Sequence, residues 1–174
     1  ALALANPISA EMGEMRLSLW PGLIEALRFN LRRQHERVRL FEVGTRFEME
    51  AGRLVESQAI AGLISGAALP EQWGADRRAA DFFDLKADVE ALFALTGRSA
   101  AISYVARAHD TLHPGRSAAV MDGKTCVGWL GQLQPELARK LEIREAPWIF
   151  ELAIDPSFRS EVPVFTDISR FPAI

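Results

Sequence analysis

The sequence has very few of the residues that cross-link a fold or form a reactive site. Cys126 is the only cysteine among 174 residues, so no disulfide can form within the chain, and a lone thiol is typical of a reducing, cytoplasmic setting. No apolar run reaches the ~18 residues that a membrane-spanning helix needs. Glycine-rich phosphate loops of the Walker or dinucleotide-binding type are also missing from the sequence. We therefore expect a cytoplasmic protein that contacts no membrane.

The chain also lacks a surplus of charge of one sign. It carries 20 basic and 23 acidic residues, for a net charge of −3, whereas domains that bind nucleic acid tightly are usually basic. Apolar residues make up 49% of the chain, as in ordinary soluble domains. A chain of this length buries about 70% of the surface that it exposes when unfolded, so its core needs no disulfide or metal ion to be stable.

A helix followed at once by a strand is predicted near the start of the chain. Pro21 suits the first turn of a helix, because its missing N–H costs nothing there. An apolar stripe at helical spacing accompanies it, made of Trp20, Leu23, Ile24, Leu27 and Leu31. The strand that follows has apolar residues on both faces, namely Val38, Leu40, Phe41, Val43 and Phe47. Two apolar faces predict a central strand of a sheet rather than an edge strand.

The rest of the chain mixes further strands with helices. Strands are predicted at residues 58–66, 101–105 and 147–155, and a hairpin at Asp122-Gly123, which is a strong turn signal between two apolar runs. A helix is predicted from Asp81, which can cap it, to Gly97, which is placed to end it. A short helix begins at Pro135. This mixture predicts an α+β fold, with helices packed on an antiparallel sheet.

Two groups of residues raise the question of catalysis or metal binding. His109 and His113 are four apart with Asp110 between them, the spacing of a zinc pair on a helix, but the following Pro-Gly argues against a helix. An ordinary loop is the better interpretation. Cys126 could use a histidine such as His113 as a base, yet it lies within a predicted strand, where a buried and inert thiol is the usual outcome. We therefore expect no catalytic residue and no metal site among them.

Charged residues elsewhere point more to structure than to chemistry. The predicted helix carries several carboxylates, Asp81, Asp84, Asp88 and Glu90, which the helix dipole favours near an N-terminus without any acid–base role. In the stretch HPGRSAAV, the N–H of Gly115 and the guanidinium of Arg116 could contact an anion. The alternative is a turn into a strand, with Arg116 paired to a surface carboxylate. Arg116 is thus the one candidate for an anion contact.

Six stretches of the sequence follow one another in a characteristic order. They are NPISAEMGEMRLSLWPGLIEALRFNLRRQHERVRLFEVGTRF, FFDLKADVEALF, LHPGRSAAV, GWLGQLQPEL, FELAID and ISRFPAI. Together they resemble the β subunit of bacterial phenylalanyl-tRNA synthetase, over residues 6–174. The resemblance implies a class II aminoacyl-tRNA synthetase-like fold, an antiparallel sheet flanked by helices, for a catalytic-like core at residues 1–160. It also implies that residues 161–174 are a linker toward a C-terminal anticodon-binding domain that this sequence does not contain.

The resemblance implies a role in assembly. In that family two α and two β subunits form a tetramer, in which the α subunit activates phenylalanine with ATP and charges tRNA(Phe). The implied partners are therefore the α subunit, a second β subunit and, through the whole enzyme, tRNA(Phe). ATP and Mg²⁺ belong to that holoenzyme, and no cofactor is expected in this segment. Residues 21–47 resemble the family's motif 1, which serves as an interface, so the expected contact residues are Leu23, Leu27, Leu31, Arg28 and Phe41.

The residues that amino-acid activation requires are missing from the expected places. Developing charge on ATP must be held by cations, and class II enzymes use an arginine in a motif 2 loop and another after a glycine-rich motif 3. The only Arg-x-Glu here is Arg46 with Glu48, which continues the predicted first strand. GWLGQLQPEL occupies a place comparable to motif 3 but lacks the arginine. The sequence therefore predicts a synthetase-like module without catalytic or ATP-binding residues.

Two other functions stay open at the level of sequence. One is an independent class II-like, ATP-dependent ligase that activates a small carboxylic acid, against which the missing arginines argue. The other is a tRNA-binding module, which a basic patch of Arg28, Arg32, Arg33 and Arg37 would favour and the acidic net charge disfavours.

Overall fold

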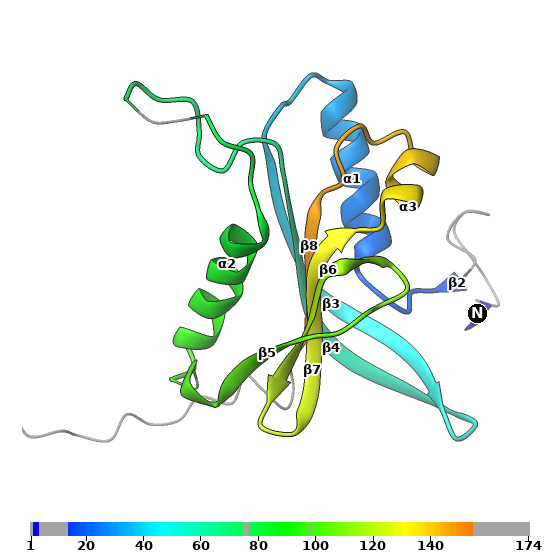
Figure 1. Ribbon diagram of the computed structural model, residues 1–174. Coiled ribbons are helices and arrows are strands. Elements are labelled where there is room, and N and C mark those ends of the chain that lie inside the picture. Colours follow the sequence, from blue (N-terminus) through cyan, green and yellow to red (C-terminus); the bar gives the residue numbers. More distant parts are fainter. Residues whose placement is uncertain (1, 4–13, 75–76, 98, 155–174) are drawn as a thin grey trace, which may run out of the picture.

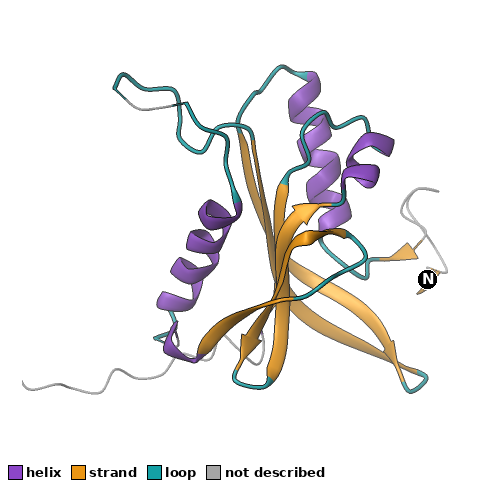
Figure 2. Cartoon of the chain, viewed as in Figure 1, coloured by secondary structure: helices purple, strands orange, loops and turns teal. Residues whose placement is uncertain are grey.

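The computed structural model describes residues 2–3, 14–74, 77–97 and 99–154, and a six-stranded antiparallel sheet forms its centre. The strands lie in the order β3-β4-β8-β7-β6-β5 (Figures 1 and 2). Their bounds are β3 (Val38–Glu50), β4 (Arg53–Ser65), β5 (Ile102–Ala106), β6 (Leu112–Asp122), β7 (Thr125–Leu133) and β8 (Trp148–Ala153). β1 (Leu2–Ala3) and β2 (Glu14–Met15) form a separate two-stranded sheet. The predicted α+β fold with an antiparallel sheet is confirmed.

Helices cover both faces of the sheet. α1 (Trp20–Arg32) and α3 (Pro135–Lys140) lie on one face, and α2 (Phe82–Ala94) lies on the other, followed by the 3₁₀ turn η2 (Ser99–Ala101) (Figure 1). β8 serves both layers, since Ile149 packs with the α1 side while Phe150 and Leu152 pack with the α2 side. This alternation follows from the two-residue period of a strand. The core is thus two apolar layers that share one sheet.

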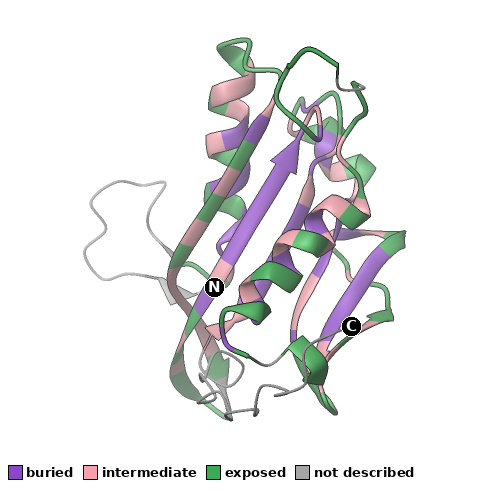
Figure 3. Ribbon diagram, turned by 90° about the vertical axis from the view of Figure 1, so that its left-hand side faces the viewer, coloured by how far each residue is buried: buried purple, intermediate pink, exposed green. Residues whose placement is uncertain are grey.

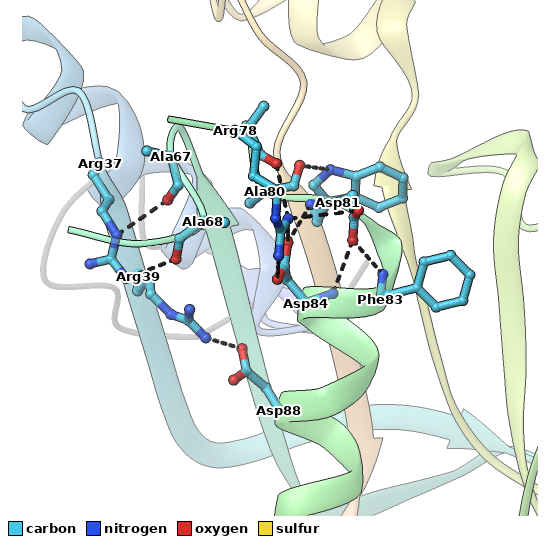
Figure 4. A network of polar contacts seen from close by, with 12 residues as sticks. Arg37, Arg39, Ala67, Ala68, Arg78, Ala80, Asp81, Phe83, Asp84 and Asp88 are labelled. Carbon is cyan, nitrogen blue, oxygen red and sulfur yellow. Dashed lines mark hydrogen bonds and ion pairs between the residues drawn. The ribbon is translucent and has the colours of Figure 1, made fainter. Parts of the chain in front are cut away.

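Local chemistry sets both ends of α2. The Asp81 carboxylate accepts hydrogen bonds from the N–H groups of Phe83 (2.8 Å) and Asp84 (3.1 Å), and the Asp84 carboxylate accepts one from the N–H of Asp81 (2.9 Å) (Figure 4). This reciprocal pair is a capping box. Arg78 donates two hydrogen bonds of 2.6 Å to Asp84, which are the main cause of a pKa of Asp84 below its ordinary value. The predicted cap is confirmed, and Gly97, at φ +74°, follows the end of the helix.

The position of β3 differs from the prediction. β3 lies at one end of the sheet, so it is an edge strand, and the prediction of a central strand was wrong. Val38 is buried and Leu40 is partly buried against the α1 layer, but Phe41 and Val43, on the opposite face, are 76% and 54% exposed. Two apolar faces therefore indicate here that one face lacks a cover in the described part of the chain.

The predicted β6–β7 hairpin is confirmed, with its turn one residue later than expected. Asp122 pairs with Thr125, which leaves Gly123 and Lys124 at the tip. Gly123 adopts a φ of +58°, a conformation that glycine reaches without steric cost.

Tyr104 of β5 lies beneath α2 and allows a test of the core at high pH. Its hydroxyl is buried without a hydrogen-bond partner among the described residues, and burial, followed by the charge of Glu90, raises the pKa of Tyr104 to about 12. The unfolded chain has a tyrosine pKa of about 10, so the unfolded state loses its proton first. We expect full stability below pH ~10 and a loss of stability from pH ~10 to ~12.

The measurement is unambiguous because Tyr104 is the only tyrosine of the chain. Absorbance at the phenolate band should titrate near pH 12 in the folded protein. Tyr104→Phe should leave stability at pH 7 unchanged or raise it by up to about 1 kcal/mol, because it removes an unsatisfied buried hydroxyl. An ordinary tyrosine titration in the folded protein would contradict this assignment.

Candidate functional site

Glu151 of β8 is the one charged residue that is buried in the described part of the chain, with 7% of its surface exposed. Its Oε2 accepts hydrogen bonds from Ser18 Oγ (2.8 Å) and from the N–H of Leu19 (2.7 Å). Its Oε1 forms an ion pair of 3.1 Å with Nη1 of Arg46. Three segments that are distant in the sequence therefore meet at one carboxylate, on the α1 face of the sheet.

Arg46 of β3 makes further polar contacts inside the same group. Besides its bond to Glu151, its Nε donates to Ser57 Oγ (2.9 Å), and its Nη1 lies 3.9 Å from a carboxylate oxygen of Glu48. Residues 46 and 48 point to the same face because side chains alternate along a strand. We call Ser18, Arg46, Glu48, Ser57 and Glu151 the Glu151 cluster.

A cavity of about 320 Å³ opens beside the Glu151 cluster. Aromatic rings form part of its wall: His109 stands edge-on to Trp20 with ring centroids 5.3 Å apart, and its centroid lies 4.8 Å from that of Trp129. The pKa of His109 lies below its ordinary value, mainly because the ring is buried, while Asp110 and Glu151 act in the opposite direction. His109 is therefore neutral at pH 7. Among the lining residues Arg46 is the one permanent cation, and it faces two carboxylates.

This arrangement is poorly suited to hold a nucleotide. Triphosphate binding needs cations that are free to meet the phosphate oxygens. In the cavity Arg46 is held by Glu151 and approached by Glu48, so the net charge of Arg46, Glu48 and Glu151 is −1 and repels an anion. The residues present do not fit ATP at this position.

His113 and Cys126 do not come together, whereas His109 and Cys126 both line the cavity beside the Glu151 cluster. His113 and Cys126 lie toward opposite ends of the β6–β7 hairpin, since Leu112 pairs with Leu133 and Met121 with Cys126. Nδ1 of His113 accepts from the N–H of Gly115 (3.1 Å). The residues that the structure describes contain no group of three or more His, Cys, Asp or Glu side chains able to hold a metal ion.

Cys126 is exposed, so the expectation of a buried thiol was wrong. The pairing of β7 with β8 begins only at Gly128. Cys126 therefore lies beyond the part of β7 that a neighbouring strand covers on that side.

Two donors of the predicted anion contact already have partners. Arg116 donates from Nη1 to Gln132 Oε1 (2.8 Å), and the N–H of Gly115 is used by His113. The stretch belongs to β6, with a shift of register between Leu112 and Ser117. An anion at Arg116 stays a prediction.

The carboxylates of α2 have structural partners. Asp81 and Asp84 form the capping box, Asp88 forms an ion pair with Arg39, and Glu90 forms one with Lys86 (Figure 4 for the first three). These partners explain their presence without an acid–base role.

The expected contact residues of the first helix and strand fall into two groups. Leu23 and Leu27 are buried against the sheet of their own domain, so their side chains offer no surface to a partner. Leu31 and Arg28 are partly buried, and Phe41 is exposed. Phe29 of α1, which the sequence did not single out, is 54% exposed with Arg33 stacked 4.0 Å from its ring centre.

Comparison with known proteins assigns the family. The family model of the "Phenylalanyl tRNA synthetase beta chain CLM domain" matches residues 1–154. The chain belongs to the phenylalanyl-tRNA synthetase β-chain family. It is 47% identical over 174 residues to the phenylalanine–tRNA ligase β subunit of Nitrosococcus oceani and 48% identical over 172 residues to that of Pseudomonas putida, covering 99% and 98% of this chain. The β subunit of Coxiella burnetii is 42% identical over 174 residues, all of this chain.

The chain spans 22% of the length of each of those relatives. In three dimensions it is similar to Desulfitobacterium hafniense PylSc, a pyrrolysyl-tRNA synthetase, with a TM-score of 0.54 and 18% identity, covering 80% of this chain and 46% of that one. The predicted class II aminoacyl-tRNA synthetase-like fold is confirmed. No helix of the described residues is long and apolar enough to cross a membrane.

Sequence reasoning did not find the centre of the Glu151 cluster. The available signal was a single glutamate inside the apolar strand sequence WIFELA. A charge in such a strand must be paired or hydrogen-bonded once it is buried, so it marks a polar cluster. Its partners, at Ser18 and Arg46, are more than 100 residues away and carry no local signature.

Proposed function

We propose that the chain is the non-catalytic, synthetase-like domain of the β subunit of a phenylalanine–tRNA ligase, and that it supports assembly with the catalytic α subunit in the cytoplasm. One observation carries the non-catalytic part: among the described residues that line the cavity beside the Glu151 cluster, Arg46 is the one permanent cation, and Glu151 and Glu48 neutralise its charge. The β-chain family membership supports the rest.

The partners follow from this assignment. We propose the α subunit, a second β subunit in a two-α, two-β tetramer, and tRNA(Phe) bound by the holoenzyme, with ATP and Mg²⁺ used outside this domain. We also propose that residues 1–160 form the core, and that residues 161–174 lead toward an anticodon-binding domain. The family match to residue 154 supports the first boundary. The motif residues 6–13 and 168–174 lie outside the described part of the chain.

The competing functions receive less support. Three of the four arginines of the suggested basic patch are already engaged: Arg28 with Glu25, Arg33 on the ring of Phe29, and Arg37 with the carbonyls of residues 67 and 68. A ligase would need free cations in the cavity beside the Glu151 cluster, where Arg46 is paired with Glu151. Neither a tRNA-binding module nor an independent ligase is therefore proposed.

An exchange assay tests the non-catalytic role. The folded chain, supplied with ATP, Mg²⁺, labelled pyrophosphate and either phenylalanine or small carboxylic acids, should give no label in ATP above the protein-free background. The assembled α–β ligase serves as positive control. Exchange by the chain alone that disappears in Arg46→Met would establish the ligase alternative instead.

Co-purification tests the assembly role. A tagged full-length β subunit should retain the α subunit, and Phe29→Asp should reduce that retention at least ~10-fold, since a charge placed in a desolvated contact costs more than about 1.4 kcal/mol. Phe83→Asp is the matched control, because Phe83 is a comparably exposed phenylalanine (72%) on α2, at the opposite face of the sheet. Retention of α by the Phe29 variant and its loss with the Phe83 variant would place the contact on the α2 side.

A further inference from the structure

We propose that Trp73 anchors the catalytic α subunit, by inserting its indole ring into an apolar pocket of α. Trp73 lies in the connection between β4 and α2, and we call residues 67–74 the Trp73 arm. The proposal rests on the proposed function and deepens it, because it adds a second contact with α to the one tested at Phe29.

Trp73 exposes more of its surface than any other large hydrophobic residue in the described part of the chain, at 105%. The residues around it are exposed as well, from Leu69 to Gly74 (green, at the top of Figure 3). A covered tryptophan removes up to about 250 Å² from water, and tryptophan is among the residues most enriched at the energetic centre of protein interfaces. A fully exposed indole is therefore the strongest candidate for an anchor on this surface.

Hydrogen bonds fix the base of the Trp73 arm. The N–H of Ala68 donates to the carbonyl of Arg78 (3.0 Å), and Ala67 pairs with Ala79 in a β-bridge. The guanidinium of Arg37 donates to the carbonyls of Ala67 (3.2 Å) and Ala68 (3.3 Å) (Figure 4). An arm whose base is ordered before binding loses less conformational entropy when a partner binds.

A cavity of about 610 Å³ adjoins the Trp73 arm. Its walls come from the arm, from the C-terminal end of α1 and the turn into β3, and from the connection between α3 and β8. Four arginines and three glutamates line it, so its charges nearly cancel. A rim of mixed charge beside an exposed aromatic residue is the composition of a protein–protein contact, whereas a nucleic-acid surface would be strongly basic.

The same cavity joins the Trp73 arm to α1. Leu31 of α1 lines it, and Phe29, the exposed residue at which a contact with α is tested, lies two residues earlier. Figure 1 shows the arm and the C-terminal end of α1 at the same, upper end of the sheet. A stable interface buries about 800 Å² on each partner, of which one phenylalanine supplies only part. Extending the contact across the cavity to Trp73 enlarges that area, and the partner at both ends is then α.

Hydroxyl-radical footprinting measures whether Trp73 is covered. Trypsin releases residues 54–77 as one peptide, in which Trp73 is the only aromatic residue, and residues 79–86 as another, which contains the exposed Phe83. Oxidation of Trp73 should be at least ~10-fold slower in the assembled α–β ligase than in the full-length β subunit alone, because a covered anchor excludes water. Oxidation of Phe83, on α2, should stay the same.

Two outcomes of the footprint would overturn the proposal. A Trp73 that oxidises equally fast with and without α is not an interface residue. A Trp73 that is already protected in β alone is covered by another part of β or by a second copy. In either case, retention of α by the tagged β subunit still supports the assembly role, so the two proposals fail separately.

Photo-crosslinking identifies the partner within the assembled ligase. The proposed tetramer contains a second β subunit, which could also protect Trp73 once α is added. A photoreactive phenylalanine analogue in place of Trp73 should therefore form its bond to α. A bond to the second β subunit would overturn the assignment.

Substitution measures the contribution of the indole. Trp73→Ala in full-length β should speed the dissociation of α at least ~10-fold, whereas Trp73→Phe should have a smaller effect because it keeps an aromatic ring. Leu95→Ala is the matched control, since Leu95 is 82% exposed at the far end of α2. Both alanine variants should unfold at the same urea concentration as the unchanged protein, because neither side chain is buried. An unchanged dissociation rate in Trp73→Ala would contradict the anchoring role.

Discussion

Replacing Gly66 with alanine is expected to destabilise the domain by at least about 3 kcal/mol, among the largest effects of any single methyl group. Gly66 directly follows β4 with a φ of +84°, and a Cβ there would lie 1.8 Å from the carbonyl oxygen of Glu36. That oxygen belongs to the backbone between α1 and β3, which cannot move aside as a flexible side chain can. The left-handed conformation alone costs an alanine about 1–2 kcal/mol, and the overlap adds to it.

Gly74→Ala is the matched control for this prediction. Gly74 has nearly the same φ, +81°, but no atom of the described residues lies within 4 Å of the place that an alanine methyl group would take there. The Gly74→Ala variant should lose only the conformational cost, about 1–2 kcal/mol. Urea unfolding of both variants separates strain from collision, and equal losses at the two positions would show that the contact between Gly66 and Glu36 is not formed.

Glu151→Ala is expected to cost about 3 kcal/mol or more. The substitution orphans the N–H of Leu19 and removes the carboxylate that faces Arg46. A buried donor without a partner costs about 1–3 kcal/mol, and breaking a buried ion pair from one side costs about 3–5 kcal/mol. Arg46 keeps some exposure, so water will recover part of the second cost. Glu151→Gln should lose less, because its amide oxygen can still accept from Leu19.

A double-mutant cycle with Arg46→Met isolates the ion pair. If Arg46 is held mainly by Glu151, the double variant should be more stable than the sum of the two single losses predicts, by about 1–3 kcal/mol. Additive losses would mean that Glu151 acts through Ser18 and Leu19 alone. The result also bears on function, because an Arg46 that is not committed to Glu151 would be free to meet a phosphate.

The parts of the fold that were predictable are those that short stretches of sequence encode. Each of three such features depends on residues that are close together in the sequence. They are the capping box at Asp81 and Asp84, the apolar stripe of α1 and the β6–β7 hairpin. The order of six stretches was enough to indicate the family and, with it, the fold. Exposure of Cys126 was missed because it depends on where a neighbouring strand begins.

The sequence by itself determined where most helices and strands form and which residues share a face, since these follow from local conformational preference and periodicity. It also shows that a Walker or dinucleotide-binding glycine motif is missing. Only the tertiary structure decided that β3 is an edge, that Leu23 and Leu27 belong to the core, and that Glu151 meets Ser18 and Arg46. Periodicity tells which side chains point the same way, but not which strand lies next to which. The long-range pairing of strands decides which strands are neighbours. It therefore also decides where the cavity beside the Glu151 cluster and the outer edge of β3 lie.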